Sequence, residues 1–132
     1  MKRYSEEHLW VESRDGTATV GLTPYAADEL GEITFVELPE VGTVFSQGDV
    51  LCVVETAKAA TELIAPIGGT VLAVNQRLDD EPELLSSAPE SAGWICRLTD
   101  LDPGEFEALL TEDEYELFLA GTEGDAAPNP RP

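Results

Sequence analysis

The chain has 132 residues, and 27 Asp and Glu against 7 Lys and Arg give it a formal charge of −20 at pH 7. This length fits one domain with a modest core, and the charge disfavours binding to nucleic acid or anionic lipid. The start turns acidic after two positive charges, unlike a signal or transit peptide, and no run approaches the roughly 20 apolar residues of a membrane helix. We expect a cytoplasmic monomer whose partners are proteins.

The cysteines and the single histidine form no catalytic or metal-binding pattern. Cys52 and Cys96 lie inside apolar stretches and in no Cys-x-x-Cys pair, which predicts buried thiols in a reducing compartment. His8 has no Ser, Cys or paired acid in a recognisable arrangement, so a packing or capping role is favoured over a general base. We expect no catalytic residue and no metal site.

Turn residues between β-prone runs predict a succession of short strands. Asp15-Gly16 marks the first hairpin, because Gly tolerates the positive φ of a tight turn. In the third strand, Ile33, Phe35 and Val36 are expected to supply the apolar surface. The expected strands cover residues 8–13, 17–22, 32–38, 50–56, 59–65, 70–75 and 94–99. This spacing predicts a mainly β fold, either a flattened β-barrel or a sandwich.

Capping residues predict short helices around this β body. Thr23 is an N-cap followed by proline, which predicts a helix at that point. Residues 79–87 are acidic and are expected to form a loop with one helical turn. Asp102 opens a further helix expected to reach Leu110, with Glu105 as the carboxylate of a capping box.

A second helix is expected near the C-terminus, where Thr111 and Glu114 repeat the capping pattern. Four apolar residues of this helix are expected to pack on the body: Tyr115, Leu117, Phe118 and Leu119. From residue 121 the composition is too poor in apolar surface to fold. We therefore expect a domain over residues 1–120 and a disordered tail over residues 121–132.

Lys58 is the strongest indication of function. The chain has two lysines, Lys2 near its start and Lys58 between two β-prone runs, where a hairpin tip is expected. Alanines on both sides keep this tip small, and Glu55 and Glu62 flank it with negative charge. A lone accessible amine in this setting suits an enzyme that modifies lysine.

Several motifs occur in a fixed order along the chain. Around the lysine they read Glu55-Thr56-Ala57-Lys58-Ala59-Ala60-Thr61-Glu62 and Ala65-Pro66-Ile67-Gly68-Gly69, and elsewhere His8-Leu9-Trp10, Leu30-Gly31-Glu32-Ile33, Phe35-Val36-Glu37-Leu38-Pro39 and Gly93-Trp94. This ordered set resembles the glycine cleavage system H protein family, with the hairpin corresponding to its lipoyl-attachment site. The resemblance extends over residues 4–119.

The resemblance implies a barrel-sandwich hybrid of the lipoyl-domain type that serves as a carrier and has no catalysis of its own. It implies lipoate in amide linkage to Lys58, attached by a lipoyl ligase or octanoyltransferase. The implied partners are a pyridoxal-phosphate glycine decarboxylase that supplies an aminomethyl group, a folate-dependent aminomethyltransferase that removes it, and dihydrolipoyl dehydrogenase. Glu55 and Glu62 are either contacts for the modifying enzyme or acids at strand ends.

Three alternative functions compete with this interpretation. A biotin carrier is disfavoured, because methionines usually flank the modified lysine in that family, whereas alanines flank Lys58. An H-like relay of lipoyl or octanoyl groups, or a redox carrier outside glycine cleavage, would share the fold. An unmodified acidic protein-binding module is the third. Residues 86–94 lack the Asn, Tyr and first Gly common in this loop of the family, which leaves room for different partners.

Overall fold

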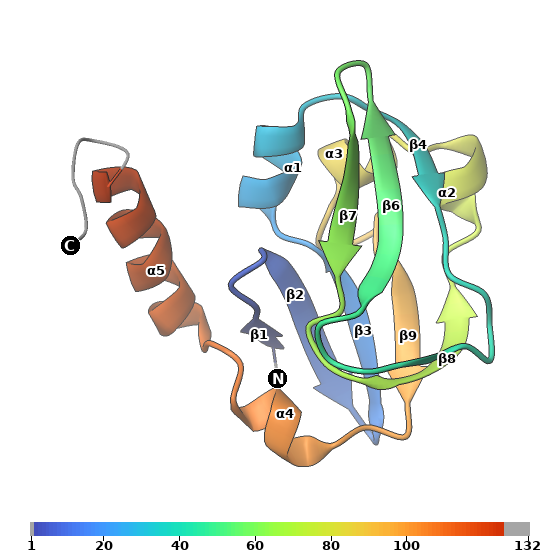
Figure 1. The fold of residues 1–132 in the computed structure, drawn as a ribbon, viewed down its shortest axis with the longest axis vertical. Coiled ribbons are helices and arrows are strands. Elements are labelled where there is room, and N and C mark those ends of the chain that lie inside the picture. Colours follow the sequence, from blue (N-terminus) through green and yellow to red (C-terminus); the bar gives the residue numbers. More distant parts are fainter. Residues whose placement is uncertain (1, 126–132) are drawn as a thin grey trace.

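The structure, a computed structural model, describes residues 2–125, which form nine strands and five helices (Figure 1). The strands are β1 (Lys2–Tyr4), β2 (Leu9–Arg14), β3 (Thr17–Leu22), β4 (Ile33–Glu37), β5 (Val44–Phe45), β6 (Val50–Thr56), β7 (Ala60–Ile64), β8 (Gly69–Val74) and β9 (Cys96–Thr99). The helices are α1 (Pro24–Leu30), α2 (Arg77–Asp80), α3 (Leu84–Ser87), α4 (Pro103–Glu107) and α5 (Glu112–Asp125).

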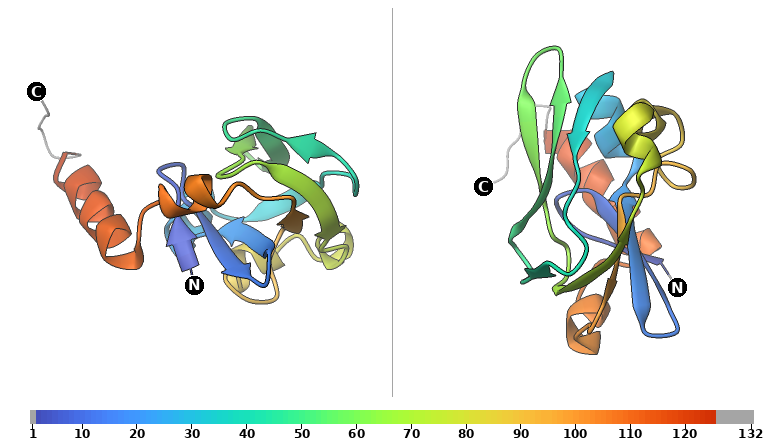
Figure 2. Two further views of the ribbon diagram at one scale, coloured as in Figure 1. Left: turned by 90° about the horizontal axis from the view of Figure 1, so that it is seen from below. Right: turned by 90° about the vertical axis from the view of Figure 1, so that its right-hand side faces the viewer.

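Two antiparallel sheets pack face to face. The larger has the strand order β1-β2-β3-β9-β8-β5, and the smaller has the order β4-β6-β7. Figure 2 shows them as two layers, with the β6–β7 hairpin extending beyond the body and α5 standing to one side. Neither strand order closes on itself, so the mainly β prediction is confirmed in its open, sandwich form.

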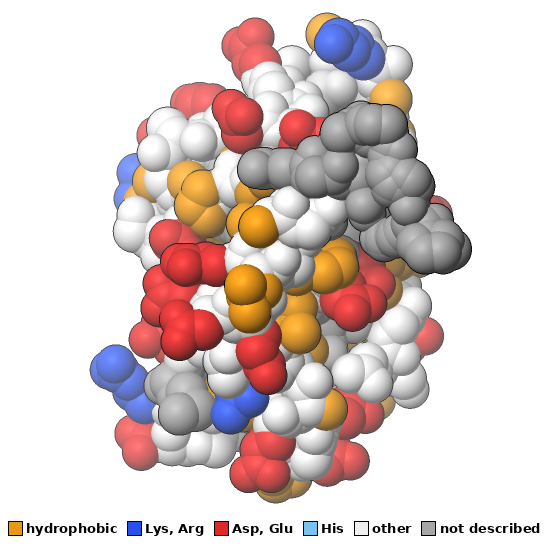
Figure 3. Space-filling view, turned by 90° about the vertical axis from the view of Figure 1, so that its left-hand side faces the viewer, with side chains coloured by type: hydrophobic (Ala, Val, Ile, Leu, Met, Phe, Trp, Pro, Cys, Tyr) orange, Lys and Arg blue, Asp and Glu red, His pale blue; other side chains and the backbone are white. Residues whose placement is uncertain are grey.

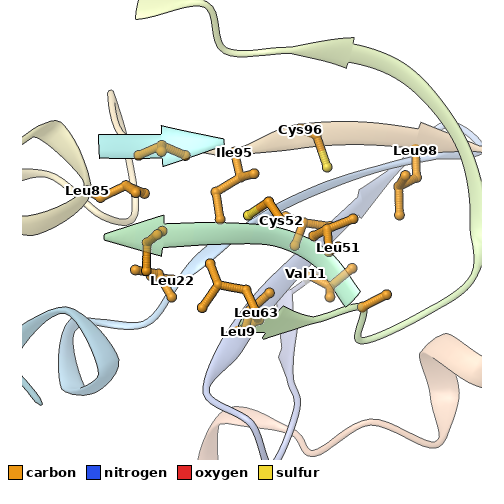
Figure 4. Close-up of a cluster of buried hydrophobic side chains, with 14 of the residues drawn as sticks. Leu9, Val11, Leu22, Leu51, Cys52, Leu63, Leu85, Ile95, Cys96 and Leu98 are labelled. Atoms are coloured by element: carbon orange, nitrogen blue, oxygen red, sulfur yellow. The ribbon is translucent and has the colours of Figure 1, made fainter. Parts of the chain in front are cut away.

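The core lies between the two sheets and contains both cysteines (Figure 4). Leu9 and Val11 of β2 face Leu51 and Cys52 of β6, while Cys96 extends inward from β9. Both thiols are free and buried, as predicted. Burial raises the pKa of Cys96 to about 12 and holds the pKa of Cys52 far above its usual range, because a thiolate is poorly solvated there.

The hairpin and helix signals of the first 30 residues are confirmed. Asp15 and Gly16 adopt φ angles of 52° and 81°, the left-handed conformation that a two-residue turn requires. The Thr23 hydroxyl accepts a hydrogen bond from the backbone N–H of Ala26 at 3.2 Å, so it caps α1. Local sequence was sufficient here because each interaction spans three residues or fewer.

Helix α4 begins as predicted but ends earlier. Asp102 accepts a hydrogen bond from the first turn, as an N-cap does. Glu105 completes no capping box, because its carboxylate accepts a hydrogen bond from the distant Gly68 N–H at 2.8 Å. The helix stops at Glu107, and Leu110 instead exchanges two backbone hydrogen bonds of 2.8 Å with Tyr4.

Helix α5 has the predicted capping box and is longer than expected. The Thr111 hydroxyl accepts from the Glu114 N–H at 3.2 Å, while the Glu114 carboxylate accepts from the Thr111 N–H at 2.9 Å. The helix continues to Asp125, so residues 121–125, expected to be disordered, are helical. The rest of the expected tail, residues 126–132, lies outside the described residues.

Three surface details differ from expectation. Leu117 is 73% exposed, because α5 contacts the body along one side only. Phe35 is 48% exposed, because a bulge at Thr34 interrupts the alternation after Ile33 and turns Phe35 outward. The expected helical turn is found as α3, but α2, which buries Leu78, was not predicted.

Candidate functional site

The β6–β7 hairpin presents Lys58 at its tip, as the sequence predicted. Glu55 pairs with Ala60 as the last register pair of the two strands. The Thr56 N–H donates to the Ala59 carbonyl at 2.9 Å, which closes the turn. The Thr56 hydroxyl accepts from the N–H groups of Lys58 and Ala59 at 3.2 and 3.3 Å. A side chain of β6 therefore holds the backbone of the tip.

Thr56 is a functional-site residue that the sequence analysis missed. The available signal was a threonine two residues before Lys58, since Ser and Thr hydroxyls commonly bond to backbone groups two or three residues further on. Thr34 supports the same region, because its hydroxyl donates to the Glu55 carbonyl at 3.1 Å across the bulge of β4. The tip thus rests on side-chain contacts from two strands.

The two lysines have different environments. Lys58 is exposed and belongs to neither of the two ion pairs found among residues 2–125. The Lys2 amine lies 3.7 Å from the Glu90 carboxylate and 4.8 Å from the centre of the Trp10 ring. Lys2 is thus held by charge and by a cation–π contact, whereas the Lys58 amine extends freely from the turn.

Glu55 and Glu62 share the outer face of the three-stranded sheet. Glu55 pairs with Ala60 and Glu62 pairs with Val53, which makes the two carboxylates diagonal neighbours across the hairpin. Both side chains are exposed. The structure therefore brings Glu55 and Glu62 together on one face of the hairpin whose tip carries Lys58.

A hollow of about 260 Å³ lies beside β7 and begins three residues from Lys58. Its lining combines apolar and aromatic side chains, including Tyr25, Leu30 and Leu63, with carboxylates at Glu7, Glu29 and Glu62. Figure 3 shows the face of the molecule on which α1 and α5 lie, where acidic side chains surround a band of hydrophobic ones. This combination suits an apolar group that ends in positive charge.

His8 lines the same hollow and is held in place by aromatic contacts. Its Nδ1 lies 2.8 Å from the Tyr115 hydroxyl, and its ring centre lies 4.7 Å from that of Tyr25. Burial lowers the pKa of His8, against the smaller opposing effects of Glu7 and Glu29. The predicted packing role is confirmed, and the imidazole also joins α5 to the body.

The unusual loop over residues 86–94 is tied to its surroundings. The Trp10 indole donates to the Pro89 carbonyl at 3.0 Å, and the Ser86 hydroxyl donates to the Gly31 carbonyl at 3.0 Å. A Cβ on Gly93 would lie 2.3 Å from the Leu84 carbonyl oxygen, so only glycine fits there. Whether this loop changes the choice of partner stays a prediction.

Fold and site together define a class of protein, a β-sandwich carrier domain with an accessible lysine at a hairpin tip. None of the helices in the described range 2–125 is long and apolar enough to cross a membrane. Within the same range, no group of three or more His, Cys, Asp or Glu side chains is placed to hold a metal ion.

Comparison with known proteins specifies the family. The family model described as glycine cleavage H-protein matches residues 2–122. The glycine cleavage system H protein of Listeria innocua is 47% identical over 116 residues, covering 88% of this chain and 93% of that protein. The corresponding protein of Thermotoga maritima is 43% identical over 120 residues, covering 91% of this chain and 97% of that protein.

A solved structure agrees. The crystal structure of a glycine cleavage system H protein from Mycobacterium marinum superposes with a TM-score of 0.79 at 34% identity, covering 93% of this chain and 96% of that one. The chain belongs to the glycine cleavage system H protein family. It is therefore a carrier component of the glycine cleavage system.

Proposed function

We propose that Lys58 is the lipoylated residue of this H protein and that the chain serves as a non-catalytic carrier. The observation that supports this proposal is the contrast between the two lysines. Lys58 is exposed on a turn whose backbone is held by Thr56, while the Lys2 amine is held between Glu90 and Trp10. An acyl-transferring enzyme can reach the Lys58 amine without breaking any of these contacts.

The tip fits a covalently attached lipoyl group. Ala57 and Ala59 are exposed and small, so they leave space around the amine for an active site that must close on it. Lipoate, when bound, supplies a disulfide that accepts the aminomethyl group of glycine. The protein contributes a rigid hairpin and a long tether, which raise the local concentration of the reactive group at each partner enzyme.

The hollow beside β7 is proposed as a resting place for the modified side chain. Amide formation removes the positive charge of Lys58. Burial of the modified lysine side chain against Tyr25 and Leu63 would therefore no longer require desolvation of an ion. Glu7 and Glu62 at the same hollow would favour a cationic end group by charge attraction. These residues would shield the cargo between visits to the enzymes.

The proposed partners are glycine decarboxylase, the aminomethyltransferase, dihydrolipoyl dehydrogenase and the lipoyl ligase or octanoyltransferase. The relay outside glycine cleavage and the unmodified acidic module are not favoured by the family comparison. The formal charge of −20 suits partners that present Lys and Arg around their active sites.

Intact-mass spectrometry tests the attachment site. Protein produced in a lipoate-supplied host should carry the mass of one lipoyl group, and Lys58→Arg should carry none. Lys2→Arg is the matched control and should be modified like the wild type. An increment that persists in Lys58→Arg, or one that disappears in Lys2→Arg alone, would contradict the assignment.

Reconstitution with glycine decarboxylase tests the carrier role. Lipoylated protein should stimulate the exchange of bicarbonate into the carboxyl group of glycine, and Lys58→Arg should not. A lipoylated protein that gives no stimulation would favour the relay outside glycine cleavage. A protein that takes no lipoyl group from a competent ligase would favour the unmodified module.

Glu55 and Glu62 are proposed as contacts for the modifying enzyme. Glu55→Gln and Glu62→Gln remove one charge each from the outer face of the hairpin, so both should slow modification of Lys58. Glu116→Gln, on the exposed surface of α5, is the control for lost charge alone. Equal modification rates in all three variants would assign both acids to the ends of their strands only.

A further inference from the structure

Phe35 is an exposed aromatic residue beside the β6–β7 hairpin that carries Lys58. The bulge at Thr34 places Ile33 and Val36 in the core and turns Phe35 to the outer face, where its side chain is 48% exposed. In register it pairs with Glu55, three residues before Lys58. Half-exposed aromatic side chains are frequent anchors in protein interfaces.

Phe35 stands at one end of a groove of about 590 Å³ between β4 and α2. Apolar side chains continue along this groove through Leu38, Pro39 and Val41, and Val41 is 63% exposed. The segment after Val41 is held against β8, because the Gly42 N–H donates to the Val71 carbonyl at 2.8 Å, and Leu72 of that strand is 50% exposed. Exposed apolar side chains that line a groove indicate an interaction site.

Among residues 2–125, every charged side chain that lines the groove is negative. Its charged lining residues are Glu37, Glu40 and Asp79, all carboxylates. The nearby Arg77 of α2 is paired with Glu81 at 3.5 Å. A partner protein that complements this groove presents an apolar projection bordered by Lys and Arg. A second copy of this chain does not fit, because it would place carboxylates against carboxylates on a molecule of charge −20.

We propose that this groove, from Phe35 to Val41, docks the enzyme that acylates Lys58. The proposal rests on the function proposed above. That enzyme must bring its active site to the lysine amine itself, whereas the other partners meet only the far end of a long tether. Phe35 lies about 10 Å along the strands from the tip and one strand spacing of about 4.8 Å across. A standard interface of roughly 800 Å² per partner, a disc of roughly 16 Å radius, covers both.

Two substitutions in the groove and one outside it test the docking. Phe35→Ser and Val41→Ser each remove an exposed apolar side chain, while Leu117→Ser removes one of 73% exposure from α5 as the matched control. Calorimetric titration of the unmodified proteins with purified acyl-transferring enzyme gives Kd, and acyl-transfer assays give KM and kcat. Thermal unfolding checks that each variant is folded.

The groove variants should raise Kd and KM about tenfold and leave kcat unchanged, because docking is weakened and the tip is intact. Leu117→Ser should match the wild type. An increase from about 50 to about 300 mM NaCl should weaken wild-type binding, because the border of the groove is charged.

Three outcomes would overturn the proposal. Wild-type Kd and KM in both groove variants would show that the enzyme docks elsewhere. A wild-type dimer that Phe35→Ser converts to a monomer would assign the groove to a second copy. A wild-type protein that accepts no acyl group would contradict the proposed function and, with it, the docking, so the two failures are distinguishable.

Discussion

The side-chain oxygen of Thr56 accepts a hydrogen bond from the backbone N–H of Lys58 at 3.2 Å. The same oxygen accepts from Ala59, so one hydroxyl holds both residues of the turn that follow Ala57. We expect this geometry to set the direction in which the lysine extends.

Thr56→Val keeps the β-branched shape and removes the hydroxyl. Because a hydrogen bond contributes about 1 kcal/mol net, global stability should change by no more than about that amount. Modification of Lys58 should slow about fivefold, because the turn populates more conformations. Thr56→Ser retains the oxygen and should behave like the wild type. Intact-mass spectrometry measures the initial rate at which Lys58 is modified. Equal rates for Thr56→Val and Thr56→Ser would show that the turn needs no hydroxyl.

Gly21 lies under the Trp10 ring, and a larger residue should displace it. The two residues are register partners in β2 and β3, and a Cβ on Gly21 would lie 2.6 Å from the ring. Gly21→Ala should therefore destabilise the fold by about 1–3 kcal/mol and disturb the Trp10 hydrogen bond to Pro89. Urea unfolding followed by tryptophan fluorescence measures both effects.

The control for that experiment is Gly121→Ala in α5. No atom lies within 4 Å of a Cβ built there, and a helical position favours alanine over glycine by about 1 kcal/mol. This variant should keep or raise stability. Equal stability of the two variants would mean that the Trp10 ring moves aside at no cost.

Tyr115 joins α5 to the body through its hydroxyl. The group donates to the Thr23 hydroxyl at 2.9 Å and lies 2.8 Å from His8 Nδ1, while its ring stacks on Tyr4 at 4.7 Å. Tyr115→Phe keeps the stacking and should cost about 1–2 kcal/mol, because Thr23 and His8 each lose a buried partner.

Hydrogen exchange of the Tyr115→Phe variant should show that α5 opens faster than in the wild type. Tyr25→Phe is the matched control, since the Tyr25 hydroxyl makes no hydrogen bond among residues 2–125, and it should leave stability unchanged. If both variants unfold at the same urea concentration as the wild type, the network contributes nothing to stability.

Stability should fall in alkali as the buried thiols titrate in the unfolded chain. Burial raises the pKa of Cys96 from 9.0 to about 12, so the folded state retains a proton that the unfolded state releases. The contribution of this thiol to the free energy of unfolding is complete below pH 9. It is lost between pH 9 and about 12, at about 1.4 kcal/mol per pH unit.

Urea unfolding at several alkaline pH values measures how steeply the free energy of unfolding falls with pH. Cys96→Ala lowers stability at every pH, because it leaves a cavity, but its slope above pH 9 should be shallower than that of the wild type. Parallel pH profiles for the two proteins would contradict the assignment of the slope to this thiol.

Interactions within a few residues of one another were predictable from sequence. The Asp15-Gly16 turn, the Thr23 cap and the box between Thr111 and Glu114 each depend on neighbouring residues, and the structure confirms all three. The tip position of Lys58 was predictable for the same reason, because β-prone runs end on both sides of it.

Features set by distant partners were not predictable. Glu105 has the spacing of a capping box, yet its carboxylate is used by Gly68, 37 positions earlier in the chain. Leu117 has the character of a packing residue, but the single line of contact between α5 and the body leaves it in solvent. A pattern of neighbouring residues in the sequence does not show which distant residues lie close to a side chain in the folded protein.

The amino-acid sequence alone established the class of fold, the family resemblance and the place of Lys58 at a hairpin tip, since each depends on composition, order and short-range turns. The tertiary structure was needed to place Glu55, Glu62 and Phe35 on one face beside that lysine. The reason lies in the pairing of β4 with β6, where the Thr34 bulge reverses the side to which Phe35 points. Strand register depends on a partner strand some 20 residues away in sequence, and only the folded chain brings the two together.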